Sequence, residues 1–310
     1  MLGKRKPQRD LLESFGVRKV SPDHYLMKLN QMIDWRGIEK RLEGLYPSPE
    51  GRPSYPPLML FKALLLAQFY DLSDPELEEQ VQDRLSFQKF LGLSISEDVP
   101  DETTYCRFRD RLNQAGMFEK LFRKVNNQLE NRGLLLKQGS IVDASLIESR
   151  NRDSDPEGRW ANRKKGPTFG YKMHVSCDPE DQLIQEVELT PANVNDTKVM
   201  EDLLPAEVEK VYGDKAYDSF KRRYQFKEKG IFYGILKRAS RHHPLTEVEK
   251  RRNRRFSKIR SAVERVFAHL KNIYGFREVR YRGLVRNKGH CFLLAMAYNM
   301  GRALKLLEAT

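Results

Sequence analysis

The spacing of apolar residues changes once along the chain, near Gly139. From His24 to about Leu135 they recur at the interval of amphipathic helices, whereas beyond Gly139 several segments alternate apolar and polar positions as strands do. A chain of 310 residues is long enough for about two domains. The pattern predicts a mobile N-terminus, an all-α domain and an α/β domain, over residues 1–20, 21–136 and 137–310 respectively.

Helix starts are marked in the all-α part by proline and by short polar residues. Pro57 precedes an apolar run, Ser73 or Asp74 can cap the next helix, and a third helix follows Asp101. The third helix carries Arg107 and Arg111, so the arrangement suits a helix-turn-helix-like DNA reader with these two cations as DNA contacts. An ordinary helical bundle is the alternative, and the spacing alone favours it.

In the second part, segments of period two alternate with helical ones. We predict strands over 140–147, 170–178, 183–189, 210–213 and 231–236, with short helices over 196–204 and 219–229 and a loop over 150–166. This order is typical of an α/β domain with a mixed five-stranded sheet flanked by helices. An apolar helix over 291–298 should be buried as core.

A long helix is predicted from about Phe256 to Tyr274. Its apolar residues form one stripe, and a second stripe beside it carries Arg260, Glu264 and Lys271. Glu264 is thus held between two cations, which keeps it ionised and suits a metal ligand near phosphates. Taken alone, these residues fit a surface helix with i,i+4 ion pairs better.

Charge points to a polyanionic partner. Lys and Arg total 56 against 43 Asp and Glu, which gives a formal charge of +13, and double-stranded DNA is the simplest such partner. A basic segment with Arg254, Arg255 and Lys258 leads into the long helix, and we interpret it as a folded surface facing DNA. The alternative is an ordinary solvated face.

Cysteine usage and hydropathy bear on the compartment. The three cysteines are far apart with no CxxC spacing, which argues against disulfides and a thiolate zinc site. The N-terminus lacks the apolar region of a signal peptide, and the most apolar run, Leu58 to Tyr70, is too short to span a bilayer. We therefore expect a cytoplasmic protein that does not contact a membrane.

Three acids occupy positions that favour metal chemistry. Asp143 is central in a predicted strand, Asp214 ends another, and Glu264 lies on the long helix. Chemistry in α/β sheets gathers beyond the carboxyl ends of parallel strands, so Asp143 and Asp214 would be neighbours if their strands are. Three such carboxylates repel each other unless a divalent cation neutralises them, and oxygen ligands favour Mg²⁺, with Mn²⁺ as a substitute. Acids are abundant in this chain, so their positions carry the hypothesis.

These residues coincide with the motifs of a known family. The chain resembles bacterial insertion-sequence transposases of the DDE type, most closely the group numbered five. The matching stretches are 53–112, Ile141-Val142-Asp143-Ala144, 170–174, 190–196 and Gly213-Asp214-Lys215-Ala216-Tyr217-Asp218. Arg260, Glu264 and Lys271 match the signature Y-(2)-R-(3)-E-(6)-K. The tyrosine position of that signature is Ser257 here, a departure that leaves the three metal-ligand positions unaffected.

The resemblance implies an RNase H-like fold and roles for the matched residues. Asp143, Asp214 and Glu264 would be the catalytic metal ligands, while Arg260 and Lys271 would contact DNA phosphates near the cleaved bond. We include Lys172 among the DNA contacts, because it lies on the same strand face as His174 near the site. We expect a structural role for His174 and a packing role for Tyr217.

Function follows as three competing hypotheses. The first is a DNA transposase, an endonuclease that cuts at terminal inverted repeats and joins the ends to target DNA, as a bacterial, nucleoid-associated homodimer. The second is an RNase H-like nuclease or resolvase that cuts without joining. The third is a catalytically silent DNA-binding regulator. The presence of all three acids argues against the third.

Overall fold

The computed structural model describes residues 20–46, 54–94, 97–135, 138–150, 152–162, 166–240 and 243–309. The predicted mobile N-terminus therefore lies, except for its last residue, outside the described part. The chain divides into two compact units, one formed by Leu129–Asn299 and the other by Met1–Gln128 with Met300–Thr310. The predicted division at residue 137 instead places 300–310 with the α/β part.

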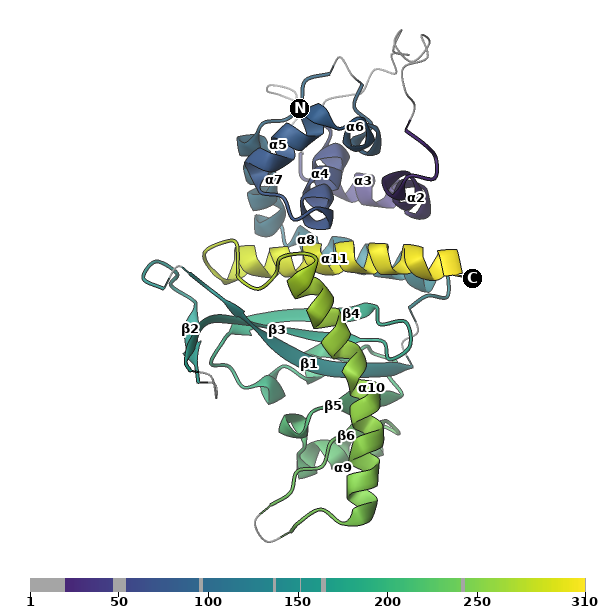
Figure 1. Ribbon diagram of the computed structural model, residues 1–310, viewed down its shortest axis with the longest axis vertical. Helices are drawn as coiled ribbons and strands as arrows, with labels where there is room; N and C mark the ends of the chain where they lie inside the picture. The colour runs from purple at the N-terminus through teal and green to yellow at the C-terminus, as the bar shows by residue number, and fades with distance from the viewer. Residues whose placement is uncertain are drawn as a thin grey trace. The chain divides into compact units, whose positions relative to one another are not determined.

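The regular elements described in the first unit are all helices, as predicted (Figure 1). Its helices are α2 (Tyr25–Met32), α3 (Arg36–Glu43), α4 (Pro57–Phe69), α5 (Asp74–Asp83), α6 (Leu85–Leu91), α7 (Glu102–Gln114) and α8 (Met117–Glu130), whose last residues belong to the second unit. The predicted helix starts are confirmed. Ser73 forms a capping box with Glu76, and Asp101 accepts a hydrogen bond from the Thr104 amide. Buried Arg109 joins α7 to Asp74 of α5 through two hydrogen bonds.

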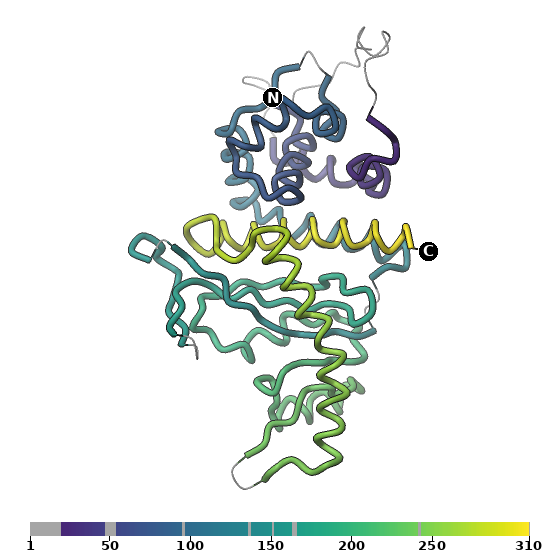
Figure 2. Tube along the Cα trace, in the orientation of Figure 1, coloured from purple at the N-terminus to yellow at the C-terminus, as the bar shows by residue number. Residues whose placement is uncertain are grey.

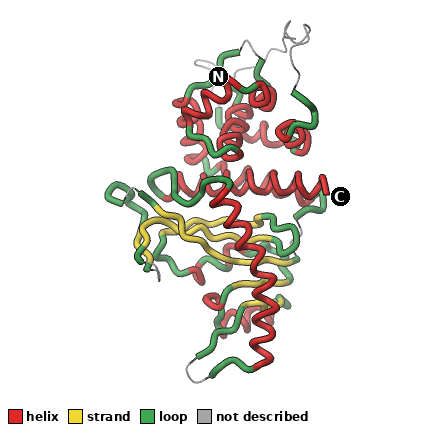
Figure 3. The backbone as a smooth tube through the Cα atoms, viewed as in Figure 1, coloured by secondary structure: helices red, strands yellow, loops and turns green. Residues whose placement is uncertain are grey.

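The second unit is built on a mixed sheet whose strands are yellow in Figure 3. The strands are β1 (Gly139–Glu148), β2 (Arg159–Ala161), β3 (Thr168–Cys177), β4 (Ile184–Pro191), β5 (Lys210–Gly213) and β6 (Phe232–Ile235). The central order is β4-β3-β1-β5-β6, with β2 paired to the start of β3. Pairs within β1, β3 and β4 are antiparallel, whereas β1, β5 and β6 run parallel. This is the strand order of an RNase H-like fold.

Local chemistry explains the antiparallel half of the sheet. The turn from β3 to β4 is fastened by Asp178, whose carboxylate accepts hydrogen bonds from the amides of Glu180 and Asp181. At the other end of β3, Gly170 lies so close to β1 that a Cβ atom there would be 2.2 Å from the carbonyl oxygen of Ile147. Only glycine, which has no Cβ atom, permits this approach. Its φ of +150° is a second reason, since other residues rarely adopt that conformation.

Helices cover both faces of this sheet. On one face lies α10 (Glu247–Asn272), whose green trace crosses the sheet in Figure 2. On the other face are η1 (Asp196–Lys198), η2 (Glu201–Leu203) and α9 (Phe220–Glu228), and the last two share a core with β1, β5 and β6. The last helix, α11 (Leu284–Ala309), has a long buried stretch from residue 291 to 301, as predicted for its apolar part.

Three predictions about these elements are wrong in detail. The predicted loop 150–166 contains β2, which gives six strands among the described residues instead of five. The predicted helix 196–204 is two 3₁₀ turns. The long helix begins at Glu247, because Thr246 and Glu249 form a capping box there, so the basic segment belongs to the helix itself.

No helix within the described ranges is both long and apolar enough to cross a membrane.

Candidate active site

The parallel pairing of β1 with β5 brings two of the predicted acids together. Val142 of β1 is the register partner of Gly213, the last residue of β5. Asp143 and Asp214 are the next residues, so they leave equivalent points of neighbouring strands. Both side chains are partly exposed. The sheet thus places the two aspartates side by side, as the sequence predicted if their strands were adjacent.

The third acid is connected to Asp143 through an arginine on α10. Arg260 donates a hydrogen bond of 2.6 Å from Nη1 to Oδ2 of Asp143, and another of 2.6 Å from Nη2 to Oε1 of Glu264. Asp143 and Arg260 are 20% and 18% exposed at their side chains, whereas Glu264 is 58% exposed. One guanidinium therefore spans the gap between a strand carboxylate and a helix carboxylate.

Packing fixes where α10 presents these groups. Val263, Val266 and Leu270 form the stripe that the helical spacing predicted, and all three are fully buried. Arg260 and Glu264 lie one turn apart beside that stripe. The helix position that binds Asp143 is thus determined by apolar burial.

The pKa of the Asp143 carboxyl is shifted by its burial and by the neighbouring charges. Burial raises its pKa to about 6, while the Arg260 guanidinium and the Ala144 amide oppose that rise. The negative charges of Asp214 and Glu264 raise the pKa further. Three carboxylates therefore influence one another here, and the Arg260 guanidinium offsets part of their repulsion.

The three acids have the right ligand chemistry for a hard divalent cation, but their side chains are not close enough together to bind one. Carboxylate oxygens are the ligands that Mg²⁺ and Mn²⁺ prefer. Within the described residues, however, no group of three or more His, Cys, Asp or Glu side chains is close enough to hold a metal ion together. The Arg260 guanidinium lies between Asp143 and Glu264, so shared ligation requires it to move aside.

Lys271 and Tyr217 flank the site in different ways. The Lys271 ammonium lies 3.1 Å from the carbonyl oxygen of Leu146, which places this cation along β1 beyond Asp143. Tyr217 is 1% exposed and packs in the core on the other face of the sheet, as the sequence favoured. Its ring approaches Gly213, where a Cβ atom would come within 3.3 Å of Cδ2.

Lys172 and His174 occupy the opposite face of the sheet from Asp143. Lys172 is the register partner of Leu146, and paired residues point to the same face of the sheet. Leu146 is three residues from Asp143, and side chains alternate between faces along a strand, so Lys172 points away from Asp143. Its ammonium donates to the Val194 carbonyl and to Asp196, both at 2.6 Å. His174 is fully buried, and burial lowers its pKa to about 4. To contact DNA, Lys172 would have to leave these two partners.

The remaining predicted cations are exposed. Arg254, Arg255 and Lys258 lie on the first half of α10, at the protein surface. In the helical unit, Arg107 and Arg111 are exposed on α7, and the Arg111 guanidinium lies 4.3 Å from the centre of the Tyr46 ring. All five side chains can be reached by a polyanion.

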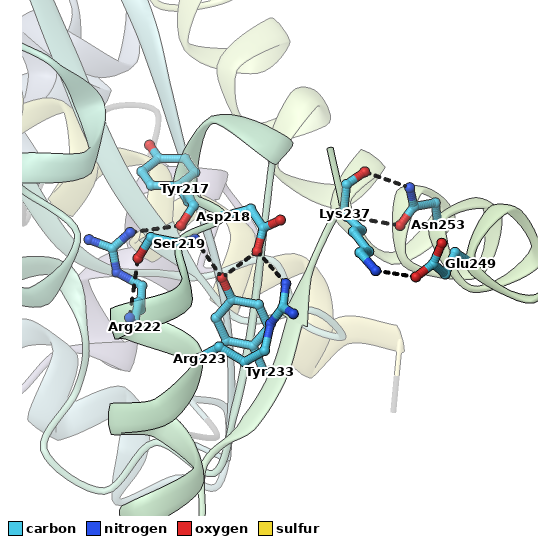
Figure 4. Close-up of polar contacts among 9 residues, drawn as sticks. All are labelled: Tyr217, Asp218, Ser219, Arg222, Arg223, Tyr233, Lys237, Glu249 and Asn253. Carbon is cyan, nitrogen blue, oxygen red and sulfur yellow. Dashed lines mark hydrogen bonds and ion pairs between the residues drawn. The ribbon is translucent and has the colours of Figure 1, made fainter. Parts of the chain in front are cut away.

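Sequence reasoning missed two polar clusters that organise this unit. Figure 4 shows Asn253 and Glu249 of α10 both facing Lys237, and Asp218 accepting hydrogen bonds from Tyr233 and Arg223. The capping pattern from Thr246 to Glu249 could have revealed the helix start that holds the first cluster. Nothing in the local sequence marks the other contacts, because they join residues from different elements.

Sequence reasoning also missed Asp155, in the predicted loop. It is 5% exposed, and its carboxylate accepts a hydrogen bond of 2.6 Å from the Tyr171 hydroxyl. Longer bonds of 3.3 Å come from the amides of Gly158 and Gly283. Asp155 therefore fastens the segment before β2 to the residues that precede α11, a structural role that the acid-rich loop did not reveal.

The second unit has the strand order of RNase H-like enzymes, with acids on β1, after β5 and on α10. Two family models match the chain. One, described as Transposase DDE domain, covers residues 135–300, and the other, described as Transposase domain (DUF772), covers residues 16–111. Since the first spans more than half of the 310 residues, the chain belongs to the Transposase DDE domain family. It is an enzyme of the transposase class from an insertion sequence, its partner is DNA, and this family uses divalent metal ions.

Proposed function

We propose that this protein is a DNA transposase that cleaves DNA at the terminal inverted repeats of its element and joins the freed ends to target DNA. The observation that carries the proposal is the register of β1 and β5. It sets Asp143 beside Asp214, while Arg260 links Asp143 to Glu264 of α10. Acids on two parallel strands and one helix, flanked by cations, suit phosphodiester chemistry.

Asp143, Asp214 and Glu264 would hold the divalent ions, Mg²⁺ or in its place Mn²⁺. When bound, such ions activate a water molecule or a 3′-hydroxyl and stabilise the leaving oxygen of the phosphodiester. The protein's own contribution is to fix the three carboxylates on rigid elements and to shield their repulsion before DNA arrives. A carboxylate with a raised pKa, as Asp143 has, must lose its proton to act as a ligand.

Arg260 would change partners during binding. Its guanidinium is held by two carboxylates, and a DNA phosphate offers the same bidentate acceptor geometry. Transfer of Arg260 to a phosphate would free oxygens of Asp143 and Glu264. Lys271, along β1, would contact a second phosphate near the cleaved bond, and the exposed cations of α10 and α7 would bind the DNA backbone further away.

The assembly and location follow from the reaction. Two ends of one element are cut and joined in concert, so we infer a homodimer that acts on double-stranded DNA of the bacterial nucleoid. The net charge of +13 supports binding to transposon ends and to target DNA alike.

A nicking assay tests the proposal. The substrate is a DNA fragment carrying the inverted repeats that flank the reading frame, incubated with Mg²⁺ or Mn²⁺. Nicking at the repeat ends should occur with the unaltered protein and be lost in Asp143→Asn and Asp214→Asn. Asp202→Asn, an exposed acid of η2, is the matched control and should nick normally.

A joining assay separates the proposed function from its competitors. Supercoiled plasmid is added as target, and integration of the labelled repeat end is measured. Nicking without joining would identify a nuclease or resolvase, and binding to the ends without nicking under any divalent metal would identify a silent regulator. Nicking that survives Asp143→Asn would exclude the assignment of the acids.

A further inference from the structure

A short turn, residues 214–219, leads the chain away from the sheet at Asp214. It contains η3 (Lys215–Tyr217), which begins directly after Asp214 and precedes α9. The amide of Tyr217 donates a hydrogen bond of 3.0 Å to the main-chain carbonyl of Asp214. The Tyr217 ring lies against Gly213, the residue before Asp214. Tyr217 therefore contacts the chain on both sides of Asp214, so a displacement of Tyr217 would displace this acid as well.

Arg222, one of the two buried residues of α9, holds the main chain of Tyr217 in place. Its Nη1 donates a hydrogen bond of 2.7 Å to the carbonyl oxygen of Tyr217, as Figure 4 shows. Its amide donates to the hydroxyl of Ser219, the cap of α9. The hydroxyl of Tyr217 has no hydrogen-bond partner among the described residues, so its side chain is held by packing alone. The guanidinium thus supplies a polar hold on this turn that the tyrosine side chain does not.

Two further hydrogen bonds attach the same guanidinium to the 3₁₀ turns before β5. Nη2 donates to the carbonyl oxygen of Thr197 in η1, and Nε donates to Oε1 of Glu201 in η2, both at 2.9 Å. The Arg222 side chain is 9% exposed, whereas that of Glu201 is 54% exposed and water screens its charge. Arg222 therefore connects the turn that follows Asp214 to two turns from an earlier part of the chain.

We propose that Arg222 is a positioning residue for Asp214, because it holds the Tyr217 carbonyl and so fixes the turn from which Asp214 projects. The proposal rests on the proposed function, since it takes Asp214 to be a metal ligand. Arg222 contacts neither the metal nor DNA in this role, because its guanidinium is buried and binds three acceptors of the protein itself. Its effect on catalysis passes through Asp214 alone.

Arginine suits this role because the guanidinium is planar and its N–H groups point in fixed directions. Three acceptors around one rigid fork constrain one another's positions. Lysine keeps the charge but has a single nitrogen on a flexible stem, so it cannot bind all three acceptors in this arrangement. The buried carbonyl of Tyr217 would then lose its partner unless the turn moved. Replacing Arg222 by lysine should therefore loosen residues 214–219 although the charge is conserved.

The test compares Arg222→Lys with Arg109→Lys. Arg109 is the matched control, because it is 7% exposed and joins α7 to Asp74 of α5, in the other unit. Each variant should lower the melting temperature by about 3 °C, since each loses part of a buried hydrogen-bond set. Hydrogen exchange in the metal-free protein, measured by mass spectrometry, should become about tenfold faster over residues 214–219 in Arg222→Lys. In Arg109→Lys the exchange of this segment should be unchanged.

The dependence of nicking on metal is the second measurement. The Mn²⁺ concentration for half-maximal nicking of repeat-end DNA should rise about tenfold in Arg222→Lys, the lower end of the range for residues that support metal ligands. In Arg109→Lys it should stay within about twofold of the unaltered protein. Affinity for the same DNA in EDTA should change less than about twofold in Arg222→Lys, because a buried cation contacts no phosphate.

A milder pair of variants decides the question if Arg222→Lys does not fold. Glu201→Ala removes the carboxylate partner of Arg222 from an exposed position and should raise the Mn²⁺ requirement about threefold, the value of one exposed ion pair. Asp202→Ala removes the same charge from the next residue of η2, which is also exposed. It should leave the Mn²⁺ requirement unchanged.

Three results would overturn the inference. Unchanged exchange over residues 214–219 in Arg222→Lys would mean that Arg222 does not hold the turn. Faster exchange with an unchanged Mn²⁺ requirement would make Arg222 a structural residue without a role toward Asp214. Equal changes in Arg109→Lys, or in both variants of η2, would mean a general loosening of the protein. Absence of nicking by the unaltered protein would instead reject the proposed function, so the two failures are distinguished.

Discussion

The two faces of the sheet carry ion pairs with the same nitrogen–oxygen distance. Arg260 binds Asp143 at 2.6 Å on the α10 face, and Lys172 binds Asp196 at 2.6 Å on the other. All four side chains are less than a third exposed. The pairs differ in what surrounds them. Arg260 faces a third carboxylate, whereas Lys172 is also bound by the Val194 carbonyl and closes a turn.

This difference distinguishes a candidate functional site, on the α10 face, from a purely structural contact on the other face. On the α10 face the acids outnumber the cation, so the arrangement has charge left for a further positive group. On the other face Lys172 has an acid and a carbonyl as partners, beside fully buried His174, and the contacts connect β3 to Val194 and to Asp196, the first residue of η1. Equal distances thus accompany unequal chemistry, and mutations on the two faces should affect different measurements.

The largest expected effect is on catalysis from the α10 face. Asp143→Asn should lower the rate of nicking by about a thousandfold, because a proposed metal ligand is lost, which exceeds the roughly 10- to 100-fold typical of supporting residues. Thermal unfolding of this variant should change little, since an amide still fits beside Arg260. A nicking rate within tenfold of the unaltered protein would remove Asp143 from the ligand set.

On the other face, the next effect is a dependence of stability on pH. Burial lowers the pKa of His174 from 6.5 to about 4. Between these values the unfolded chain binds a proton on His174 that the folded protein does not, so His174 alone should lower stability by about 3 kcal/mol as pH drops from 6.5 to 4. Asp143, whose pKa is raised to about 6, contributes in the opposite direction, so the effect of His174 is the difference between the unaltered protein and His174→Gln. Urea unfolding at several pH values measures this slope. In His174→Gln the contribution should be absent, and an unchanged slope would contradict it.

A smaller loss of stability is expected when Lys172 loses its partner. Asp196→Ala should cost about 2 kcal/mol in the free energy of unfolding, because it leaves an ammonium with little access to water. Its nicking rate per folded molecule should remain normal. The comparison between the faces would fail if Asp196→Ala reduced nicking as strongly as Asp143→Asn.

The smallest effect is expected from Lys271. Lys271→Ala should raise the apparent dissociation constant for repeat-end DNA by about tenfold, the value of one charge-assisted phosphate contact, with little change in stability. Lys271→Arg should restore part of the binding, because the charge is kept. Failure of arginine to restore any binding would indicate that the bond to the Leu146 carbonyl, and not the charge, matters.

Much of the fold could be predicted because the apolar spacing is regular where burial is one-sided. The stripe of Val263, Val266 and Leu270 follows directly from which side of α10 faces the core. The first half of α10 was not predicted as helix, because its charged residues show no apolar periodicity. Strand β2 escaped because three residues are too short for a pattern and are held by pairing with distant β3.

The sequence predicted which residues form the candidate site, but not which of their side chains contact one another. Asp143 and Asp214 stand at recognisable points of their strands, so adjacency of those strands was enough to bring them together. The bond from Arg260 to Asp143 depends on how α10 crosses the sheet, which no local pattern encodes. For the same reason no local pattern showed that the ammonium of Lys172, a predicted DNA contact, lies on the other face and binds Asp196.

The pairing of Val142 with Gly213 is made by the main chain, and so is the pairing at the start of β5, where two amides donate to the Gln138 carbonyl. These hydrogen bonds therefore require no particular residues in the exposed turn before β5. Ala206 and Glu207, exposed in the turn before β5, mark a place where a descendant of this chain could acquire extra residues, even a whole inserted module, while both aspartates kept their mutual placement.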